Sequence, residues 1–150
     1  MSRTRTIPSL IAALILSMLL MVGCLPTTGP TLTTPEAFQR MRNGELTLID
    51  IRTPEEWRQT GIAEGARRVD MRQPQGAAGF TDRVLAEVGG DKTAPIALIC
   101  RTGNRSGQMQ QELMSRGFTN VYNVIGGMAG SPADSGWLAQ GLPIRPCPQC

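Results

Sequence analysis

Four short apolar runs follow position 33, separated by polar segments that contain glycine or proline. Residues 46–51 and 95–99 are apolar enough to form strands that are buried on both faces of a sheet. Residues 68–71 and 120–124 predict two further short strands. Because segments with helical spacing separate these runs, the pattern predicts an α/β domain whose mostly parallel sheet carries helices on both faces.

The predicted helices are recognised by their start and stop signals. One helix opens at Thr34-Pro35 and ends before Gly44, since a capping residue followed by proline starts helices and glycine follows their last turn. Thr53-Pro54 repeats the signal and predicts a short helix that ends near Gly61. Apolar spacing and breakers predict a loop at residues 73–79 and helices at 80–88, about 105–117, and 132–140.

The first 23 residues have the pattern of a targeting segment. Two arginines precede an apolar run at residues 7–22, and this run is shorter than the roughly 20 residues of a membrane-spanning helix. The run ends at Cys24, in an arrangement that resembles the bacterial lipoprotein signal. The resemblance implies a signal peptide at residues 1–23, a lipidated Cys24, and a flexible tether at residues 24–32. We therefore expect a membrane-anchored lipoprotein of the bacterial cell envelope that faces the periplasm or the outside.

Composition excludes several classes of function. Removal of the first 23 residues leaves 127, with 13 basic and 12 acidic side chains, a net charge of +1. The chain has only six aromatic residues and no basic stripe, so nucleic acid is not an expected partner. It also has no histidine, which excludes a cysteine–histidine or serine–histidine catalytic pair within the chain. No metal ion or cofactor is expected.

One cysteine, Cys100, stands where a predicted strand meets a polar loop, in the stretch "ALICRTGNRSGQ". Ligand sites of parallel α/β sheets lie beyond the carboxyl ends of the strands, and a helix is expected to begin a few residues later. Backbone N–H groups at such a helix start form an anion-binding nest, and nearby cations favour the thiolate form of a cysteine. The candidate nucleophile is Cys100, and the candidate binding residues are Arg101, Thr102, Gly103, Asn104, Arg105 and Ser106.

Two alternatives compete with this interpretation of the loop. Cysteine is often only a small buried residue at the end of a strand, and Gly-Asn is common in turns. Tyrosine phosphatases also place a cysteine before a phosphate cradle, but five residues separate their cysteine from their arginine. Here four residues separate Cys100 from Arg105, and this smaller cradle favours one sulfur atom over a phosphoryl group.

The motifs around this loop resemble those of single-domain members of the rhodanese (thiosulfate sulfurtransferase) family. "LIDIRTPEEW" is similar to the family stretch Asp-x-Arg-x-x-x-Glu, "CRTGNRS" to its six-residue active loop, and "GFTNVYNVIGGMAG" to its late strand and double-glycine turn. One departure is Ile62, where the family usually has histidine. The resemblance implies a rhodanese-like domain at residues 33–145 with a five-stranded central sheet.

The resemblance also implies a persulfide mechanism. Cys100 would take the outer sulfur of thiosulfate or a related anionic donor and pass it to a thiol or cyanide, with Arg101 and Arg105 attracting the donor. Asp50, Arg52 and Glu56 are assigned to structure near the site, with an expected ion pair between Arg52 and Glu56, and Trp57 is assigned to the core.

The chain ends in a Cys-x-x-Cys stretch, "CPQC", within a predicted tail at residues 146–150. Cys147 and Cys150 could form a surface disulfide in an oxidising compartment, act as a resolving or sulfur-accepting pair, or form half of a metal site. Two alternative functions therefore stay beside the sulfurtransferase hypothesis. One is a non-catalytic rhodanese-like module that binds an anion or a partner, and the other is a thiol redox protein that uses Cys100 with the terminal pair.

Overall fold

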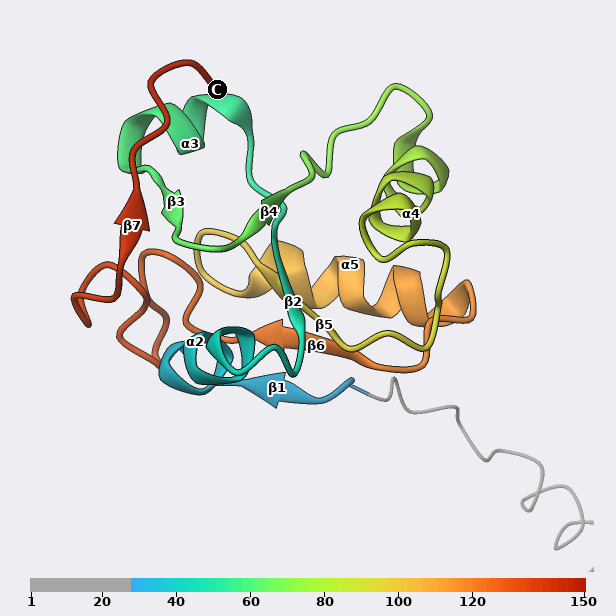
Figure 1. Cartoon of the computed structure of the whole chain (residues 1–150), viewed down its shortest axis with the longest axis horizontal. Coiled ribbons are helices and arrows are strands. Elements are labelled where there is room, and N and C mark those ends of the chain that lie inside the picture. Colours follow the sequence, from blue (N-terminus) through green and yellow to red (C-terminus); the bar gives the residue numbers. More distant parts are fainter. Residues whose placement is uncertain (1–27) are drawn as a thin grey trace, which may run out of the picture.

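The computed structural model describes residues 28–150, and its centre is a five-stranded sheet (Figure 1). Every neighbouring pair of strands in this sheet is parallel. In spatial order the strands are β1 (Thr31–Leu32), β6 (Val121–Val124), β5 (Ile96–Ile99), β2 (Thr47–Asp50) and β4 (Arg67–Arg68). The prediction of an α/β fold with a mostly parallel five-stranded sheet is confirmed.

Helices cover both faces of the sheet, as the pattern predicts. On one face, α4 (Gly76–Glu87) and α5 (Asn104–Ser115) contribute Phe80, Val84 and Leu113 to an apolar cluster with strands β2, β5 and β6. On the other face, α2 (Thr34–Arg42) and the loop after β6 contribute Ala37 and Trp137 to a second cluster. Because both faces are covered, the central strand β5 is buried at all four positions.

Both predicted helix starts form through the same hydrogen-bond arrangement, but the residue that caps the first helix is Thr33 and not the predicted Thr34. Before α2, Thr33 accepts a hydrogen bond from the backbone of Glu36, whose carboxylate accepts one from the Thr33 backbone. Thr53 and Glu56 make the same reciprocal pair at the start of α3 (Pro54–Thr60). Such capping boxes satisfy backbone donors that have no partner inside the helix.

Several predicted boundaries differ from the structure. Thr31–Leu32 forms the edge strand β1, although the sequence analysis placed these residues in a tether. The short strand predicted at residues 68–71 lies at Arg67–Arg68, and α4 begins at Gly76 inside the predicted loop. A separate two-stranded antiparallel sheet, β3 (Ile62–Ala63) with β7 (Ile144–Arg145), was not predicted. Ile62 is fully buried there, so the departure from the family pattern serves packing.

The helix predicted at residues 132–140 is wrong, because side-chain hydrogen bonds and glycine turns hold this segment in a loop. The Asp134 carboxylate accepts hydrogen bonds from the backbone and hydroxyl of Thr34 and from the backbone of Gly136. Gly130 and Gly136 both have left-handed φ angles, which interrupt a helix. The fully buried Trp137 donates its indole N–H to the carbonyl of Pro143, which fixes the loop against the core.

No helix within residues 28–150 is long and apolar enough to cross a membrane. The predicted signal peptide and the predicted lipidation at Cys24 lie outside the described residues.

Candidate active site

Cys100 lies at the carboxyl end of the central strand β5, directly before the loop that leads to α5. Its neighbour strands β2 and β6 end at the same edge of the sheet, so the segments after all three strands meet there (Figure 1). Cys100 is fully buried, and within residues 28–150 it is the only cysteine that is not in a disulfide. The sulfur therefore lies under the loop rather than on the surface.

The loop curls over Cys100 because Gly103 adopts a left-handed conformation with φ of 87°. In this conformation its backbone N–H donates a hydrogen bond to Cys100 Sγ at 3.2 Å. A Cβ atom at this position would lie 2.4 Å from the carbonyl oxygen of Ile125, so a larger residue cannot occupy it without displacing the backbone. Gly103 is thus required both for the turn and for the close approach to β6.

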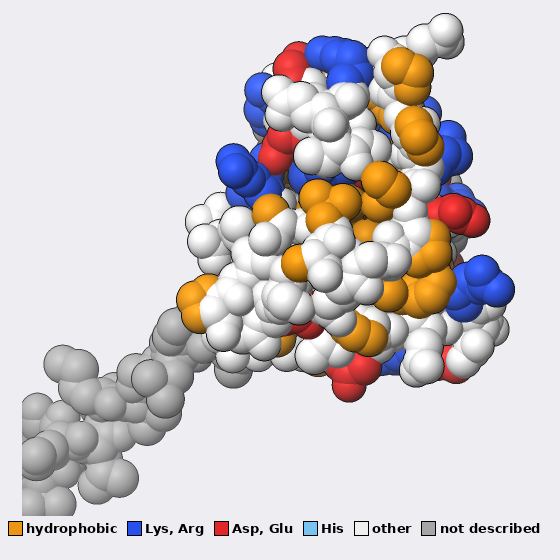
Figure 2. Space-filling view, turned by 90° about the vertical axis from the view of Figure 1, so that its left-hand side faces the viewer, with side chains coloured by type: hydrophobic (Ala, Val, Ile, Leu, Met, Phe, Trp, Pro, Cys, Tyr) orange, Lys and Arg blue, Asp and Glu red, His pale blue; other side chains and the backbone are white. Residues whose placement is uncertain are grey.

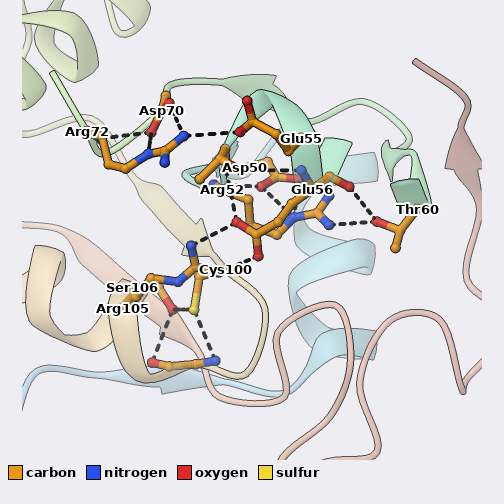
Figure 3. Close-up of polar contacts among 12 residues, drawn as sticks. Asp50, Arg52, Glu55, Glu56, Thr60, Asp70, Arg72, Cys100, Arg105 and Ser106 are labelled. Carbon is orange, nitrogen blue, oxygen red and sulfur yellow. Dashed lines mark hydrogen bonds and ion pairs between the residues drawn. The ribbon is translucent and has the colours of Figure 1, made fainter. Parts of the chain in front are cut away.

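Ser106 gives the sulfur a second polar neighbour (Figure 3). Its hydroxyl lies 3.2 Å from Cys100 Sγ and 2.7 Å from Asn123 Oδ1 on β6. A hydroxyl has one proton to donate, so Ser106 can donate to the sulfur, to Asn123, or to the carbonyl of Gly103 at 3.2 Å. A negative charge on the sulfur favours the first arrangement, because hydrogen bonds to ionised acceptors are stronger. Asn123 was not predicted, and its only signal is a polar residue within a short apolar strand.

The segment that begins with the double-glycine turn after β6 donates backbone hydrogen bonds to the first residues of the loop. The backbone N–H of Met128 donates to the carbonyl of Cys100 at 2.9 Å, and that of Ala129 donates to the carbonyl of Arg101 at 2.8 Å. A Cβ atom at Gly127 would lie within 2.7 Å of the Cys100 and Arg101 carbonyl groups. The turn therefore needs glycine so that two backbone segments can meet beside the sulfur.

Arg105 is held by Glu56 in a two-pronged ion pair, with N–O distances of 2.8 and 2.6 Å (Figure 3). The Arg105 guanidinium lowers the pKa of the Glu56 carboxyl from 4.5 to about 2, and Glu56 raises the pKa of Arg105 in turn. Because the same carboxylate also caps α3, the pair joins that helix to the active loop. The expected ion pair between Arg52 and Glu56 is wrong.

Arg52 instead pairs with Asp50 beneath the site. Its guanidinium lies 2.7 Å from the Asp50 carboxylate, and both side chains are almost completely buried. The remaining donors of Arg52 reach the hydroxyl of Thr60 and the carbonyl of Gly61, each at 2.7 Å. A buried charge needs such complete hydrogen bonding. This cluster fixes α3 to the end of β2, which agrees with the structural role expected for Asp50 and Arg52.

A cavity of about 170 Å³ opens beside the loop. Its lining residues are Arg52, Glu56, Gln59, Thr60, Arg101, Met128, Ala129 and Leu138. Arg101 is exposed and has no carboxylate partner among residues 28–150, so it presents a free positive charge at this cavity. Hydrophobic side chains gather on the side of the molecule that carries β7 (Figure 2), where Ile144 is exposed. Ile144 does not line this cavity; the apolar part of its lining is Met128, Ala129 and Leu138, which face the unpaired cation of Arg101.

The structure brings only some of the predicted residues to the sulfur. Gly103 and Ser106 contact it, whereas Arg101 lines the neighbouring cavity and Arg105 pairs with Glu56. Thr102 and Asn104 belong to the loop, but their side chains make no hydrogen bond within the described part of the chain. Residues 28–150 contain no group of three or more His, Cys, Asp or Glu side chains placed to hold a metal ion.

The terminal cysteines form a disulfide with each other and not with Cys100. Cys147 follows β7, and the backbone of Cys150 hydrogen-bonds to the carbonyl of Cys147 in a tight turn. In this state Cys100 has no cysteine partner within residues 28–150. The arrangement therefore gives no support to a redox pair between Cys100 and the terminal cysteines.

Several known proteins are similar to this chain in sequence and in fold. A family model for the rhodanese-like domain matches residues 33–131. An uncharacterized protein of Rickettsia conorii is 34% identical over 103 residues, which cover 67% of this chain and 84% of that protein. Thiosulfate sulfurtransferase GlpE of Actinobacillus pleuropneumoniae serotype 3 is 34% identical over 114 residues, covering 73% and 87%. The polysulfide-sulfur transferase homodimer of Wolinella succinogenes superposes with a TM-score of 0.58 and 28% identity, covering 77% of each chain.

Proposed function

Because this chain belongs to the rhodanese-like domain family and has sulfurtransferase relatives, we propose that it is itself a sulfurtransferase that carries sulfur on Cys100. The proposed donor is thiosulfate or a related anionic sulfane compound, and the proposed acceptor is a thiol or cyanide. The observation that carries this proposal is the buried Cys100 sulfur with the Gly103 N–H and the Ser106 hydroxyl directed at it.

In the proposed first step, the Cys100 thiolate attacks the outer sulfur of thiosulfate. The new bond joins Cys100 Sγ to that sulfur, the sulfur–sulfur bond of thiosulfate breaks, and sulfite leaves with the electron pair. The product is a Cys100 persulfide with a negative terminal sulfur. The unpaired charge of Arg101 attracts the dianionic donor to the cavity beside the loop.

In the second step the acceptor attacks the terminal sulfur of the persulfide. The bond between this sulfur and Cys100 Sγ breaks, and Cys100 leaves as a thiolate, so the cycle closes without a cofactor. Gly103 and Ser106 stabilise this thiolate at both ends of the cycle, since preorganised donors favour developing negative charge. Cyanide as acceptor yields thiocyanate, which gives a direct assay.

The test is thiosulfate-dependent thiocyanate formation by a Cys100→Ser variant. We expect turnover to be abolished, because a serine hydroxyl neither carries sulfane sulfur nor ionises near neutral pH. The matched control is the Cys147→Ser/Cys150→Ser variant, which removes cysteines elsewhere and retains turnover. Circular dichroism checks that Cys100→Ser keeps its fold, and full activity in a folded Cys100→Ser protein would refute the proposal.

We also propose that the protein is a lipoprotein of a bacterial cell envelope, anchored through Cys24. The support is the sequence alone: two arginines, an apolar run, and a cysteine after a small residue. We expect the wild type to fractionate with membranes and to begin at a lipidated Cys24, whereas Cys24→Ser stays unprocessed or is released. A fully soluble wild-type protein whose N-terminus lies elsewhere would contradict this proposal.

A further inference from the structure

The Cys147–Cys150 disulfide lies under a single cation. The guanidinium of Arg68 on β4 contacts both sulfurs, with Nη1 2.5 Å from Cys150 Sγ and 3.3 Å from Cys147 Sγ. Arg68 is placed over the ring of the buried Trp57, 5.7 Å from its centroid. The tail is held from a second direction, because Arg58 of α3 donates to the Cys150 carbonyl at 2.8 Å. The terminal loop thus lies beside α3 (Figure 1), and the Arg68 guanidinium contacts its two sulfurs.

A surface basin of about 690 Å³ adjoins this disulfide, and Cys150 forms part of its wall. Three exposed arginines of the basin, Arg68, Arg83 and Arg145, have no carboxylate partner in the described part of the chain, whereas Arg67 pairs with Glu87. The basin therefore carries a surplus of positive charge next to a sulfur atom.

One polar atom in this basin lacks a partner. The indole Nε1 of Trp57 is the one buried side-chain nitrogen or oxygen within residues 28–150 that makes no hydrogen bond, and Trp57 lines the basin beneath Arg68. Buried polar groups are nearly always paired, and an unpaired one calls for an explanation. Trp57 therefore leaves one donor without a partner next to the basin.

The disulfide itself contributes little to the stability of the folded protein. It joins residues three apart in sequence, at the end of the chain, and so short a ring removes little freedom from the unfolded chain. Its surroundings instead suit exchange, because thiol–disulfide exchange proceeds faster when the leaving sulfur is stabilised as a thiolate. Arg68 is placed to stabilise that thiolate.

We propose that the Cys147–Cys150 disulfide and its arginine basin form a thiol–disulfide exchange site, separate from Cys100, for small thiols that carry carboxylate groups. The thiolate of such a ligand attacks Cys150 Sγ and forms a mixed disulfide. The Cys147–Cys150 bond breaks, and Cys147 leaves with the electron pair as a thiolate beside Arg68. A second ligand thiolate attacks the ligand sulfur of the mixed disulfide and releases Cys150. Overall, two thiols are oxidised to one disulfide, and the terminal pair is reduced.

The test measures how fast different thiols reduce the pair in the full chain at low ionic strength. Glutathione serves as the anionic probe and cysteamine as the cationic probe, and each rate is divided by the rate of the same thiol with 2-hydroxyethyl disulfide. Alkylation and peptide mass spectrometry report Cys147 and Cys150 separately from Cys24 and Cys100. We expect the normalised rate to be at least about tenfold higher for glutathione, because a positive cleft concentrates anions.

Two variants identify the groups responsible. Arg83→Gln/Arg145→Gln is expected to remove the preference for glutathione, whereas Arg42→Gln/Arg116→Gln, which removes two charges outside the basin, keeps it. Arg68→Gln is expected to slow both thiols, because the leaving thiolate loses its cation. Thiosulfate turnover at Cys100 is expected to stay unchanged in all three variants. Failure of the exchange-site proposal is therefore distinguishable from failure of the sulfurtransferase proposal.

Three results would overturn the proposal. Equal normalised rates for glutathione and cysteamine would show that the basin does not select anions. Unchanged rates in Arg68→Gln would remove the role of that cation. A glutathione adduct trapped on Cys147 instead of Cys150 would contradict the proposed direction of attack.

Discussion

Cys100 and the Cys147–Cys150 pair both follow strands, but the chain surrounds them in opposite ways. Cys100 follows the central strand of the parallel sheet, is fully buried, and receives a backbone N–H and a hydroxyl. The terminal pair follows the short strand β7 near the surface and receives an arginine. Fixed neutral donors around a buried sulfur suit a sulfur that must carry charge in one geometry. An arginine over a half-buried disulfide suits exchange with incoming thiols.

The comparison also separates two uses of arginine. Arg105 is neutralised by Glu56 and serves as a strut between α3 and the active loop, whereas Arg101, four residues earlier, keeps its charge free beside the cavity. The two arginines were expected to have the same role in attracting donors. Arg105 has a carboxylate partner and Arg101 has none within residues 28–150, which supports the proposal that Arg105 positions the loop and Arg101 attracts the donor.

The largest effect on thiosulfate turnover is expected from a change in the loop around Cys100. Gly103→Ala forces a Cβ against the Ile125 carbonyl in a left-handed conformation, so the loop must shift. A displacement of about 1 Å at a catalytic group costs roughly 100-fold in rate, and we expect such a loss of thiosulfate turnover. Gly44→Ala is the control, because Gly44 has φ of 73° but no atom near its Cβ position. Equal turnover in the two variants would contradict the need for Gly103.

A second prediction concerns the strut and its dependence on pH. The pKa of Glu56 is lowered to about 2, so its stabilisation is complete above about pH 4.5 and is lost as the pH falls towards 2. A shift of this size corresponds to roughly 3 kcal/mol, and partial exposure of the pair reduces the expected value to about 1–2 kcal/mol. Urea unfolding should therefore show Glu56→Gln less stable than wild type at pH 6, with the gap much smaller at pH 2.5.

The control for this measurement is Glu55→Gln on the same helix turn. Glu55 makes only exposed ion pairs with Arg58 and Arg72, so its replacement should change stability much less. If the gap between wild type and Glu56→Gln were constant from pH 6 to pH 2.5, the ion pair with Arg105 would not be its source.

A third, smaller effect is expected for the free cation at the cavity. Arg101→Gln should raise the KM for thiosulfate by about three- to tenfold at low ionic strength, with the difference shrinking as salt is added, since screening weakens exposed charges. Arg116→Gln at the far end of α5 removes the same charge and should leave KM unchanged. A KM increase that is independent of salt would assign Arg101 a contact role instead of attraction.

The smallest effect is expected from the terminal pair. Cys147→Ser/Cys150→Ser should leave thiosulfate turnover unchanged and lower thermal stability only slightly, because the disulfide closes a very short ring. Persulfide discharge to a dithiol reductant, followed by rapid-quench mass spectrometry, checks the same point. Slower discharge in the variant would show that the pair accepts sulfur from Cys100.

The apolar pattern predicted the sheet well, because strands buried on both faces leave an unmistakable run such as residues 95–99. It missed β1, β3 and β7 and displaced β4, because all four are only two residues long and such strands leave little period to detect. The false helix at residues 132–140 arose because local apolar spacing cannot reveal that Asp134 bonds to Thr34, 100 residues away. A long-range hydrogen bond therefore determined the structure of this segment, and local sequence could not predict it.

The site was predictable to the extent that it is local. Cys100, Gly103 and Ser106 lie within seven residues of one another, so the loop could be found as a unit. The partners of Arg105 and Arg52 could not, because Glu56 is near Arg52 in the sequence, whereas only the arrangement of α3 brings it to Arg105, 49 residues away. Asn123 comes from another strand, and strand order is not written in local sequence.

The most direct test is the intact mass of the purified protein after incubation with thiosulfate and removal of excess donor. The proposed mechanism predicts a gain of one sulfur atom per chain, located on the Cys100 peptide and lost on addition of cyanide. The same gain is predicted for Cys147→Ser/Cys150→Ser, and none for Cys100→Ser. A wild-type protein that gains no sulfur, or that gains it on Cys147 or Cys150, would contradict the central claim that Cys100 carries the transferred sulfur.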